Sequence, residues 1–279
     1  MKPTSVVALT IGMLVLSNWG AGAIEASNPN PESSFREWCQ KQASLSAEKR
    51  KMVEVLLTQA GTSDCELAAK NLSSRTELYL SQTGTSDLSP LSGLTNLQKL
   101  HLENNQITDI SPLTELKNLT WLNLNNNQVT DVSPLVELKN LKGLELSENL
   151  ITNVSPLSEL TNLTWLVLEK NQIANVSHLA ELTNLTVLVL DGNQIRDVSP
   201  LVRLTNLTQL NLNNNQIVDV SPLAELTSAD WLFLSNNQIV DVSPLAELAN
   251  LELLVLDNNQ IVDVSPLAEL TNLNSLNLS

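Results

Sequence analysis

The sequence predicts a right-handed solenoid in which each coil contributes one short strand to a parallel β-sheet on the concave face. Three observations lead to this fold. From Arg75 onward the sequence has a period of 22 residues without insertions, leucines alternate within each period, and every full period carries an asparagine at the same place. A period of this length is typical of repeat proteins, whose units bury their apolar residues only against neighbouring units.

Each full unit reads L-x-x-L-x-L-x-x-N-x-I-x-D-V-S-P-L-x-x-L-x-x with small departures. In x-L-x-L-x the leucines point to one face of a strand and the x residues point to the other. The Ser-Pro pair, as at Ser111-Pro112, is expected to begin one short helical turn on the convex side, with the serine as its N-cap. Residues 75–279 thus comprise a degenerate first unit, eight full units and a truncated last unit that ends within a strand.

The L-x-x-L-x-L-x-x-N pattern resembles the leucine-rich repeat family. Its D-[VI]-S-P-L continuation at 22 residues is similar to the short bacterial class of internalin-type surface proteins, and a similar short repeat occurs in regulators of eukaryotic protein phosphatases. The resemblance covers about three quarters of the chain. It implies an α/β repeat solenoid with a 3-10 or loop-like convex side that acts by binding, and it implies no particular ligand.

Residues 1–23 have the features of a secretory signal peptide. Lys2 provides the positive start, Val6 to Leu16 is mostly apolar, and Ala21-Gly22-Ala23 fits a signal peptidase site. We therefore expect a secreted, periplasmic or cell-surface protein, with an uncleaved membrane anchor as the alternative. Residues 24–34 are rich in Asn, Pro, Ser and Glu and are expected to form a flexible leader.

Residues 35–74 predict a helical N-terminal cap that covers the first coil of the solenoid. Ser46 is a good N-cap for a helix with apolar residues at helical spacing, and Gly61 is a plausible end. A shorter helix is expected around Glu66 to Leu72. The cap holds both cysteines, Cys39 and Cys65, which export would place in an oxidising compartment and which we therefore expect to form a disulfide.

The sequence favours binding over catalysis. Its formal charge of −15 argues against nucleic acid or anionic membrane surfaces as partners, so contact with a membrane is expected only during export. The histidines, His101 and His178, occupy different columns of the repeat, and no nucleophile, phosphate loop or metal-ligand set accompanies them. We therefore expect no enzyme activity, no metal and no cofactor.

Two polar columns are assigned to the structure of the repeat. The asparagine column is expected to bond backbone groups of the turn that leaves each strand. The aspartate column before Ser-Pro is expected to serve the next turn, in preference to a calcium site. The first of these columns contains Asn105, Asn127, Asn149, Asn171, Asn193, Asn215, Asn237 and Asn259, and the second contains Asp87, Asp109, Asp131, Asp197, Asp219, Asp241 and Asp263.

The outward-facing strand positions vary from unit to unit, and all three tryptophans of the repeat region lie in one of these columns. Strand surfaces favour aromatic and branched residues in any case. However, solvent-facing apolar patches usually mark interaction sites, and Trp is enriched among the residues that dominate binding energy. The predicted partner-binding residues are Trp121, Gly143, Trp165, Val167, Val187, Val189, Trp231, Phe233, Leu253 and Val255.

A protein or peptide partner is the leading prediction for this face. Parallel strands lie about 4.8 Å apart, so Trp121 and Trp165 are expected roughly 10 Å apart, as two walls of a slot with Gly143 as its floor. The neighbouring acidic residues favour a partner with basic residues; they are Glu103, Glu169, Asp191 and Asp257. A carbohydrate or cell-wall ligand is the alternative, because aligned aromatic rings also stack on sugars. A phosphatase-type regulator shares the repeat but conflicts with the signal segment, and no oligomeric state is predicted.

Overall fold

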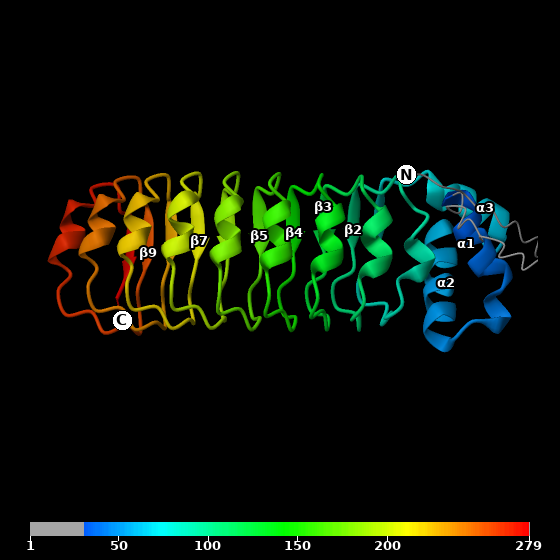
Figure 1. Cartoon of the computed structure of the whole chain (residues 1–279), viewed down its shortest axis with the longest axis horizontal. Helices are drawn as coiled ribbons and strands as arrows, with labels where there is room; N and C mark the ends of the chain where they lie inside the picture. The colour runs from blue at the N-terminus through cyan, green and yellow to red at the C-terminus, as the bar shows by residue number, and fades with distance from the viewer. Residues whose placement is uncertain (1–30, 279) are drawn as a thin grey trace, which may run out of the picture.

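The computed structural model describes residues 31–278, so the predicted signal peptide and residues 24–30 of the predicted leader lie outside the described residues. A group of helices forms one end of the molecule, and the repeats extend from it as a row of coils towards the C-terminus (Figure 1). The predicted leucine-rich repeat solenoid, with its parallel sheet and short 3-10 convex side, is confirmed.

Within the described residues, ten strands of three residues each form one parallel sheet, in the order β1 to β10. Each residue pairs with its counterpart 22 residues later, as Leu100 pairs with Leu122. Equivalent positions of successive units therefore form straight columns. The strands are β1 (Glu77–Tyr79), β2 (Lys99–His101), β3 (Trp121–Asn123), β4 (Gly143–Glu145), β5 (Trp165–Val167), β6 (Val187–Val189), β7 (Gln209–Asn211), β8 (Trp231–Phe233), β9 (Leu253–Val255) and β10 (Ser275–Asn277).

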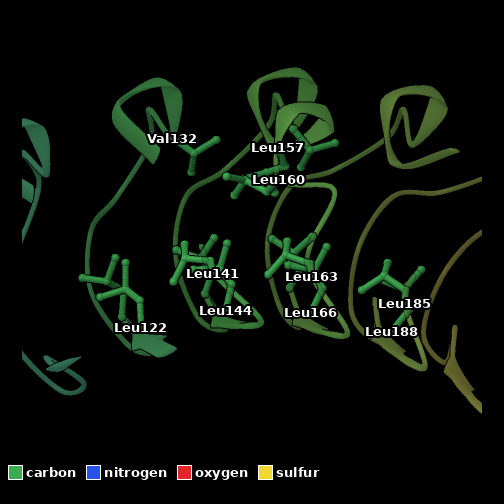
Figure 2. Packing of buried hydrophobic residues seen from close by; sticks show 14 of the residues in the cluster. Leu122, Val132, Leu141, Leu144, Leu157, Leu160, Leu163, Leu166, Leu185 and Leu188 are labelled. Carbon is green, nitrogen blue, oxygen red and sulfur yellow. The ribbon is translucent and has the colours of Figure 1, made fainter. Parts of the chain in front are cut away.

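The core is a continuous column of apolar side chains inside the coils. The central leucines of the strands point inwards, as Leu144 and Leu166 show, and meet residues from the opposite wall such as Leu157 and Leu160 (Figure 2). These side chains are fully buried. Because the central residue of each strand from β1 to β9 is committed to the core, its two neighbours face outwards on the concave side.

The convex side is built from short 3-10 helices, each of which begins at a serine that proline follows, or histidine in the case of Ser177. The prediction that this serine is the N-cap is wrong. The serine is the first helical residue, so its free N–H needs an acceptor. Asp109 provides one, because its Oδ1 accepts from the Ser111 N–H at 2.8 Å. The expected turn role of the aspartates is confirmed. The helices are η2 (Ser89–Leu91), η3 (Ser111–Glu115), η4 (Ser133–Glu137), η5 (Ser155–Glu159), η6 (Ser177–Glu181), η7 (Ser199–Arg203), η8 (Ser221–Glu225), η9 (Ser243–Glu247) and η10 (Ser265–Glu269).

The asparagine column forms the expected internal ladder. Nδ2 of Asn127 donates to the carbonyl oxygens of Leu102 and Leu124, both at 3.0 Å. Its Oδ1 accepts from the Ile107 N–H at 3.0 Å. One buried side chain therefore satisfies backbone groups of two successive coils.

A second asparagine ladder lies on the side of the coil that enters the strand, and the sequence analysis missed it. Nδ2 of Asn118 donates to the Thr95 carbonyl oxygen at 2.8 Å, and Asn162 makes the same bond with Lys139. These amides are exposed, in contrast to the first ladder. The recurring asparagine before the first leucine of each unit was the available signal.

The N-terminal cap consists of α1 (Pro31–Gln40), η1 (Gln42–Ser44), α2 (Ala47–Ala60) and α3 (Cys65–Ser73). Ser46 caps α2 by accepting from the Lys49 N–H, and Gly61 ends it with a positive φ of 72°, as expected. Helix α1 begins within the segment 24–34 that we expected to be a flexible leader, so the helical cap starts earlier than predicted.

The cap is joined internally and to the first coil. A disulfide between Cys39 and Cys65 links α1 to α3, which confirms the predicted pair. Apolar residues of the cap such as Phe35 and Leu72 belong to the same buried cluster as Leu78 of β1. The cap therefore shields the first coil from water. No helix within residues 31–278 has the length and apolar character needed to cross a membrane.

Candidate functional site

The concave face carries two rows of outward-facing residues, one on each side of the buried central leucines. The first concave row runs from Glu77 on β1 to Ser275 on β10, and the second runs from Tyr79 to Asn277. The strand register places every predicted partner-binding residue in one of these rows. The first row contains Trp121, Gly143, Trp165, Val187, Gln209, Trp231 and Leu253, and the second contains Asn123, Glu145, Val167, Val189, Asn211, Phe233 and Val255.

One apolar patch covers β3 to β6, and its members are Trp121, Gly143, Trp165, Val167, Val187 and Val189. We call it the central patch. The prediction of a slot between its two tryptophans is wrong. The ring centroids of Trp121 and Trp165 lie only 6.3 Å apart, with the ring planes tilted by 40°. A Cβ atom added at Gly143 would overlap Cε3 and Cζ3 of Trp121.

The absent side chain of Gly143 explains this arrangement. The space above the glycine backbone accepts the indole of Trp121, which covers apolar surface that would otherwise contact water. Sequence spacing gives the separation of the backbones but not the rotamer of the indole. The central patch is therefore a closed apolar surface, over which Trp165 remains 36% exposed.

A second apolar patch, the distal patch, covers β8 and β9 and consists of Trp231, Phe233, Leu253 and Val255. Trp231 is 45% exposed, more than either tryptophan of the central patch. The polar residues Gln209 and Asn211 of β7 separate the two patches. The concave face therefore presents two apolar contact areas and not one continuous stripe.

The N-terminal end of the same face is polar and already internally paired. Tyr79 stacks on His101 with ring centroids 4.6 Å apart. Nε2 of His101 lies 3.4 Å from Oε1 of Glu77 without forming a hydrogen bond, and Lys99 Nζ lies 3.8 Å from the same carboxylate. A hydrogen bond with Tyr79 holds the pKa of Glu77 below its ordinary value, assisted by the charge of Lys99.

Tyr79 was missed by the sequence analysis, although 55% of its surface is exposed. It lies in the degenerate first unit, where the repeat pattern is weakest. The available signal was its place two residues after Glu77, in the same row as His101.

Carboxylates border the central patch. Asn125 donates to Oε2 of Glu145 at 2.7 Å, and Oε2 of Glu103 is buried without a hydrogen-bond partner. Burial raises the pKa of Glu145, the bond from Asn125 opposes this shift, and the charge of Glu103 adds to it. From β3 to β9, neither concave row contains a lysine or an arginine. In these two rows Glu145 is therefore the one charged side chain of a largely apolar surface.

The described residues contain no group of three or more His, Cys, Asp or Glu side chains that could hold a metal ion. His101 faces the concave side on β2, whereas His178 belongs to a convex 3-10 helix, where its Nδ1 lies 3.3 Å from Ser177 Oγ. The two histidines therefore occupy different faces. The geometry suits the binding of a partner by surface complementarity.

Comparison with known proteins agrees with this geometry. The family model described as leucine-rich repeats in two copies matches residues 76–115, 117–159, 161–203, 183–225 and 230–269. No curated protein sequence matches the chain.

Several solved structures share the fold. An internalin from Listeria monocytogenes is 35% identical, with a TM-score of 0.71, and the match covers 82% of this chain and 75% of the internalin. Internalin C2 from the same species is 37% identical, with a TM-score of 0.61 over 82% of this chain and 92% of the other.

A plant structure is also similar. The leucine-rich repeat ectodomain of the Arabidopsis thaliana membrane receptor kinase GASSHO1/SCHENGEN3, solved in complex with CASPARIAN STRIP INTEGRITY FACTOR 2, is 29% identical with a TM-score of 0.63. That match covers 72% of this chain and 26% of the receptor ectodomain. The repeat pattern, the parallel sheet and these matches together show that the chain belongs to the leucine-rich repeat family and is internalin-like.

Proposed function

We propose that this is an exported binding protein whose concave face recognises a protein or peptide partner. The observation that carries the proposal is the combination of two apolar patches, each with a partly exposed tryptophan, with the carboxylate of Glu145 and with the absence of lysine and arginine from the concave rows of β3 to β9. A partner with apolar anchors beside basic residues complements both properties.

The central and distal patches are suited to act as anchors. Large aromatic side chains lose little conformational entropy on binding and dominate the energetics of many interfaces. Trp165 and Trp231 are partly exposed and are held on strands whose central leucines are fully buried, so their backbone is fixed before a partner arrives. The carboxylates would increase the rate of encounter with a basic partner and favour its orientation.

The plant receptor ectodomain, solved in complex with CASPARIAN STRIP INTEGRITY FACTOR 2, supports a binding role for this fold, and we infer a polypeptide as the partner here. A carbohydrate ligand is less favoured by the geometry. The indoles of Trp121 and Trp165 are tilted by 40° and share no common plane on which a sugar ring could stack across both.

Export is the second part of the proposal, and it rests on the N-terminal sequence features together with the cap disulfide. Deletion of residues 1–23 should retain the protein in the cytoplasm, whereas the full chain should reach the cell exterior or periplasm. Equal export of both forms would refute this part without affecting the binding proposal.

The binding proposal is tested by affinity capture from candidate host or extracellular protein fractions. The mature protein is compared with a Trp121→Ala, Trp165→Ala, Trp231→Ala variant and with a convex-face control, Glu137→Ala with Glu159→Ala. We expect a polypeptide that the convex control retains and the triple tryptophan variant loses. Binding of a glycan array with the same dependence on the tryptophans would instead establish the carbohydrate alternative.

A further inference from the structure

An apolar ridge runs along the flank of the last units, away from the concave face. Val218, Val240 and Val262 each follow the isoleucine that recurs in the repeat, and these valines are 55%, 46% and 88% exposed. The preceding residues Ile217 and Ile239 are fully buried. The alternation places the valines on the outer surface of the coil, and we call them the valine ridge.

The earlier units do not have this ridge. At the same column they carry polar or small residues, namely Thr108, Thr130, Thr152, Ala174 and Arg196. Threonine has nearly the same shape as valine, so the repeat itself accepts a hydroxyl at this position. The three valines are therefore not required by the fold, and a row of exposed apolar side chains is a feature of the distal units alone.

The charge along the valine ridge is mostly negative. Arg196, which precedes Val218 in the same column and donates from Nε to Oε1 of Gln216 at 2.8 Å, is the one basic side chain of this column. Each valine is followed by an aspartate, so Asp219, Asp241 and Asp263 form a parallel row beside it. Arg203 is the last cationic residue of the sequence, and residues 204–279 contain nine carboxylates. Hydrogen bonds from Ser243 and Ser265 lower the pKa values of Asp241 and Asp263, so both are ionised at neutral pH.

The distance between successive valines of the ridge favours a helix over an extended strand as the partner segment. Asp241 and Asp263 form a parallel β-bridge, so neighbouring coils on this flank approach to about 4.8 Å. Successive turns of an α-helix rise by about 5.4 Å, whereas side chains on one face of an extended strand repeat every roughly 6.7 Å. Over three coils the side chains on one face of a helix therefore stay close to the positions of the valines, whereas those on one face of an extended strand do not.

We propose that the valine ridge is a docking surface for a basic amphipathic α-helix of a partner protein, lying along the solenoid axis. Its apolar stripe contacts Val218, Val240 and Val262, and its lysines or arginines pair with the adjacent aspartates. A second copy of this chain is a poor occupant, because it would bring the same row of aspartates against its own counterpart. This surface is separate from the concave face and does not depend on the function proposed there.

The test uses a designed amphipathic Leu/Lys peptide of about 18 residues, or roughly five helical turns. Binding to the mature protein is measured by fluorescence anisotropy at physiological ionic strength, beside a peptide of identical composition with scrambled order. The matched variant is Val218→Thr, Val240→Thr, Val262→Thr, which restores the residue that the first full units carry. Trp231→Ala serves as the concave-face control.

We expect the amphipathic peptide to bind more tightly than its scrambled form, and the triple threonine variant to weaken it by at least about tenfold. Trp231→Ala should leave this affinity unchanged. Equal binding of both peptides, or equal binding to the wild-type and threonine proteins, would overturn the proposal, as would loss of binding in Trp231→Ala alone. Self-association of the wild-type protein that the threonine variant abolishes would assign the ridge to a second copy and also overturn it. Thermal melts should be the same for all three proteins.

Discussion

The asparagine ladder and the concave rows lie on the same coils, yet they differ in every physical respect. The ladder position is the same residue in all eight full units, it is buried in all of them except Asn259, and its amide is hydrogen-bonded to backbone groups, as at Asn127. The concave rows change from unit to unit and leave Trp165 and Trp231 partly exposed. Repetition therefore identifies the positions that hold the coils together, and variation identifies the positions available to a partner.

The sharpest contrast is between Leu166 and Trp165, which are neighbours on β5. Leu166 is fully buried, so Leu166→Ala should lower the free energy of unfolding by about 2–5 kcal/mol through lost contacts and a cavity. Trp165→Ala should change it by less than about 1 kcal/mol, because the indole lies on the outer face. Urea denaturation of both variants measures the difference. Similar losses would show that Trp165 belongs to the core.

The two asparagine ladders offer a second comparison. Asn171 donates to the carbonyls of Leu146 and Leu168 in a buried setting, so Asn171→Ala should destabilise the protein by about 1–3 kcal/mol. Asn162 makes one exposed bond to Lys139, where water replaces the lost amide, so Asn162→Ala should cost less than about 1 kcal/mol. Chemical denaturation distinguishes them, and an equal cost would contradict the assignment of the first ladder to the interior.

A third prediction concerns the close approach of Trp121 to Gly143. Gly143→Ala places a methyl group where the indole lies, so the ring must turn away. We expect a shift in tryptophan fluorescence with a stability change of no more than about 1 kcal/mol, because the displaced ring lies on the surface. Gly84→Ala, whose added Cβ would meet Lys51 and no indole, is the spectroscopic control. An unchanged emission spectrum in Gly143→Ala would mean that the indole does not cover the glycine.

The smallest effect should be seen at acidic pH. Hydrogen bonds from the following serines lower the pKa values of Asp197, Asp241 and Asp263 in the folded protein. A lowered folded-state pKa stabilises the protein above the unfolded value of about 3.9, and this contribution is lost as the pH falls through the folded value.

Asparagine keeps the backbone bond without titrating, as Asn153 does with the Ser155 N–H at 3.0 Å. The variant Asp197→Asn, Asp241→Asn, Asp263→Asn should therefore lose less stability than the wild type between neutral and acidic pH. Urea melts at the two pH values measure this difference. The same loss in both proteins would show that the aspartates do not contribute to acid sensitivity.

The fold was predictable because the same 22-residue pattern recurs in every full unit of the solenoid. The alternating leucines fixed which strand residues are buried, and the asparagine column fixed the ladder. The concave placement of Trp121, Trp165 and Trp231 followed from the same alternation. These inferences depend only on period and side-chain direction, which the sequence contains.

Other features depend on contacts that a period does not specify. The indole of Trp121 turns onto Gly143 because of a local space, so the expected slot does not exist. Tyr79 was not predicted, because its unit departs from the repeat pattern. At the start of the 3-10 helix η3, Asp109 and not Ser111 supplies the side-chain acceptor. For the indole of Trp121 and the carboxylate of Asp109, the conformation of one side chain decides the outcome.

The central claim is that the concave face binds the partner, and parallel measurement of affinity and stability for Trp165→Ala and Glu159→Ala tests it most directly. With the captured partner, Trp165→Ala should weaken binding by about thirtyfold, the equivalent of roughly 2 kcal/mol, while its melting temperature stays close to that of the wild type. Glu159→Ala, on the convex side, should change neither quantity. Loss of binding in Glu159→Ala with wild-type affinity in Trp165→Ala would contradict the account and assign recognition to the convex surface.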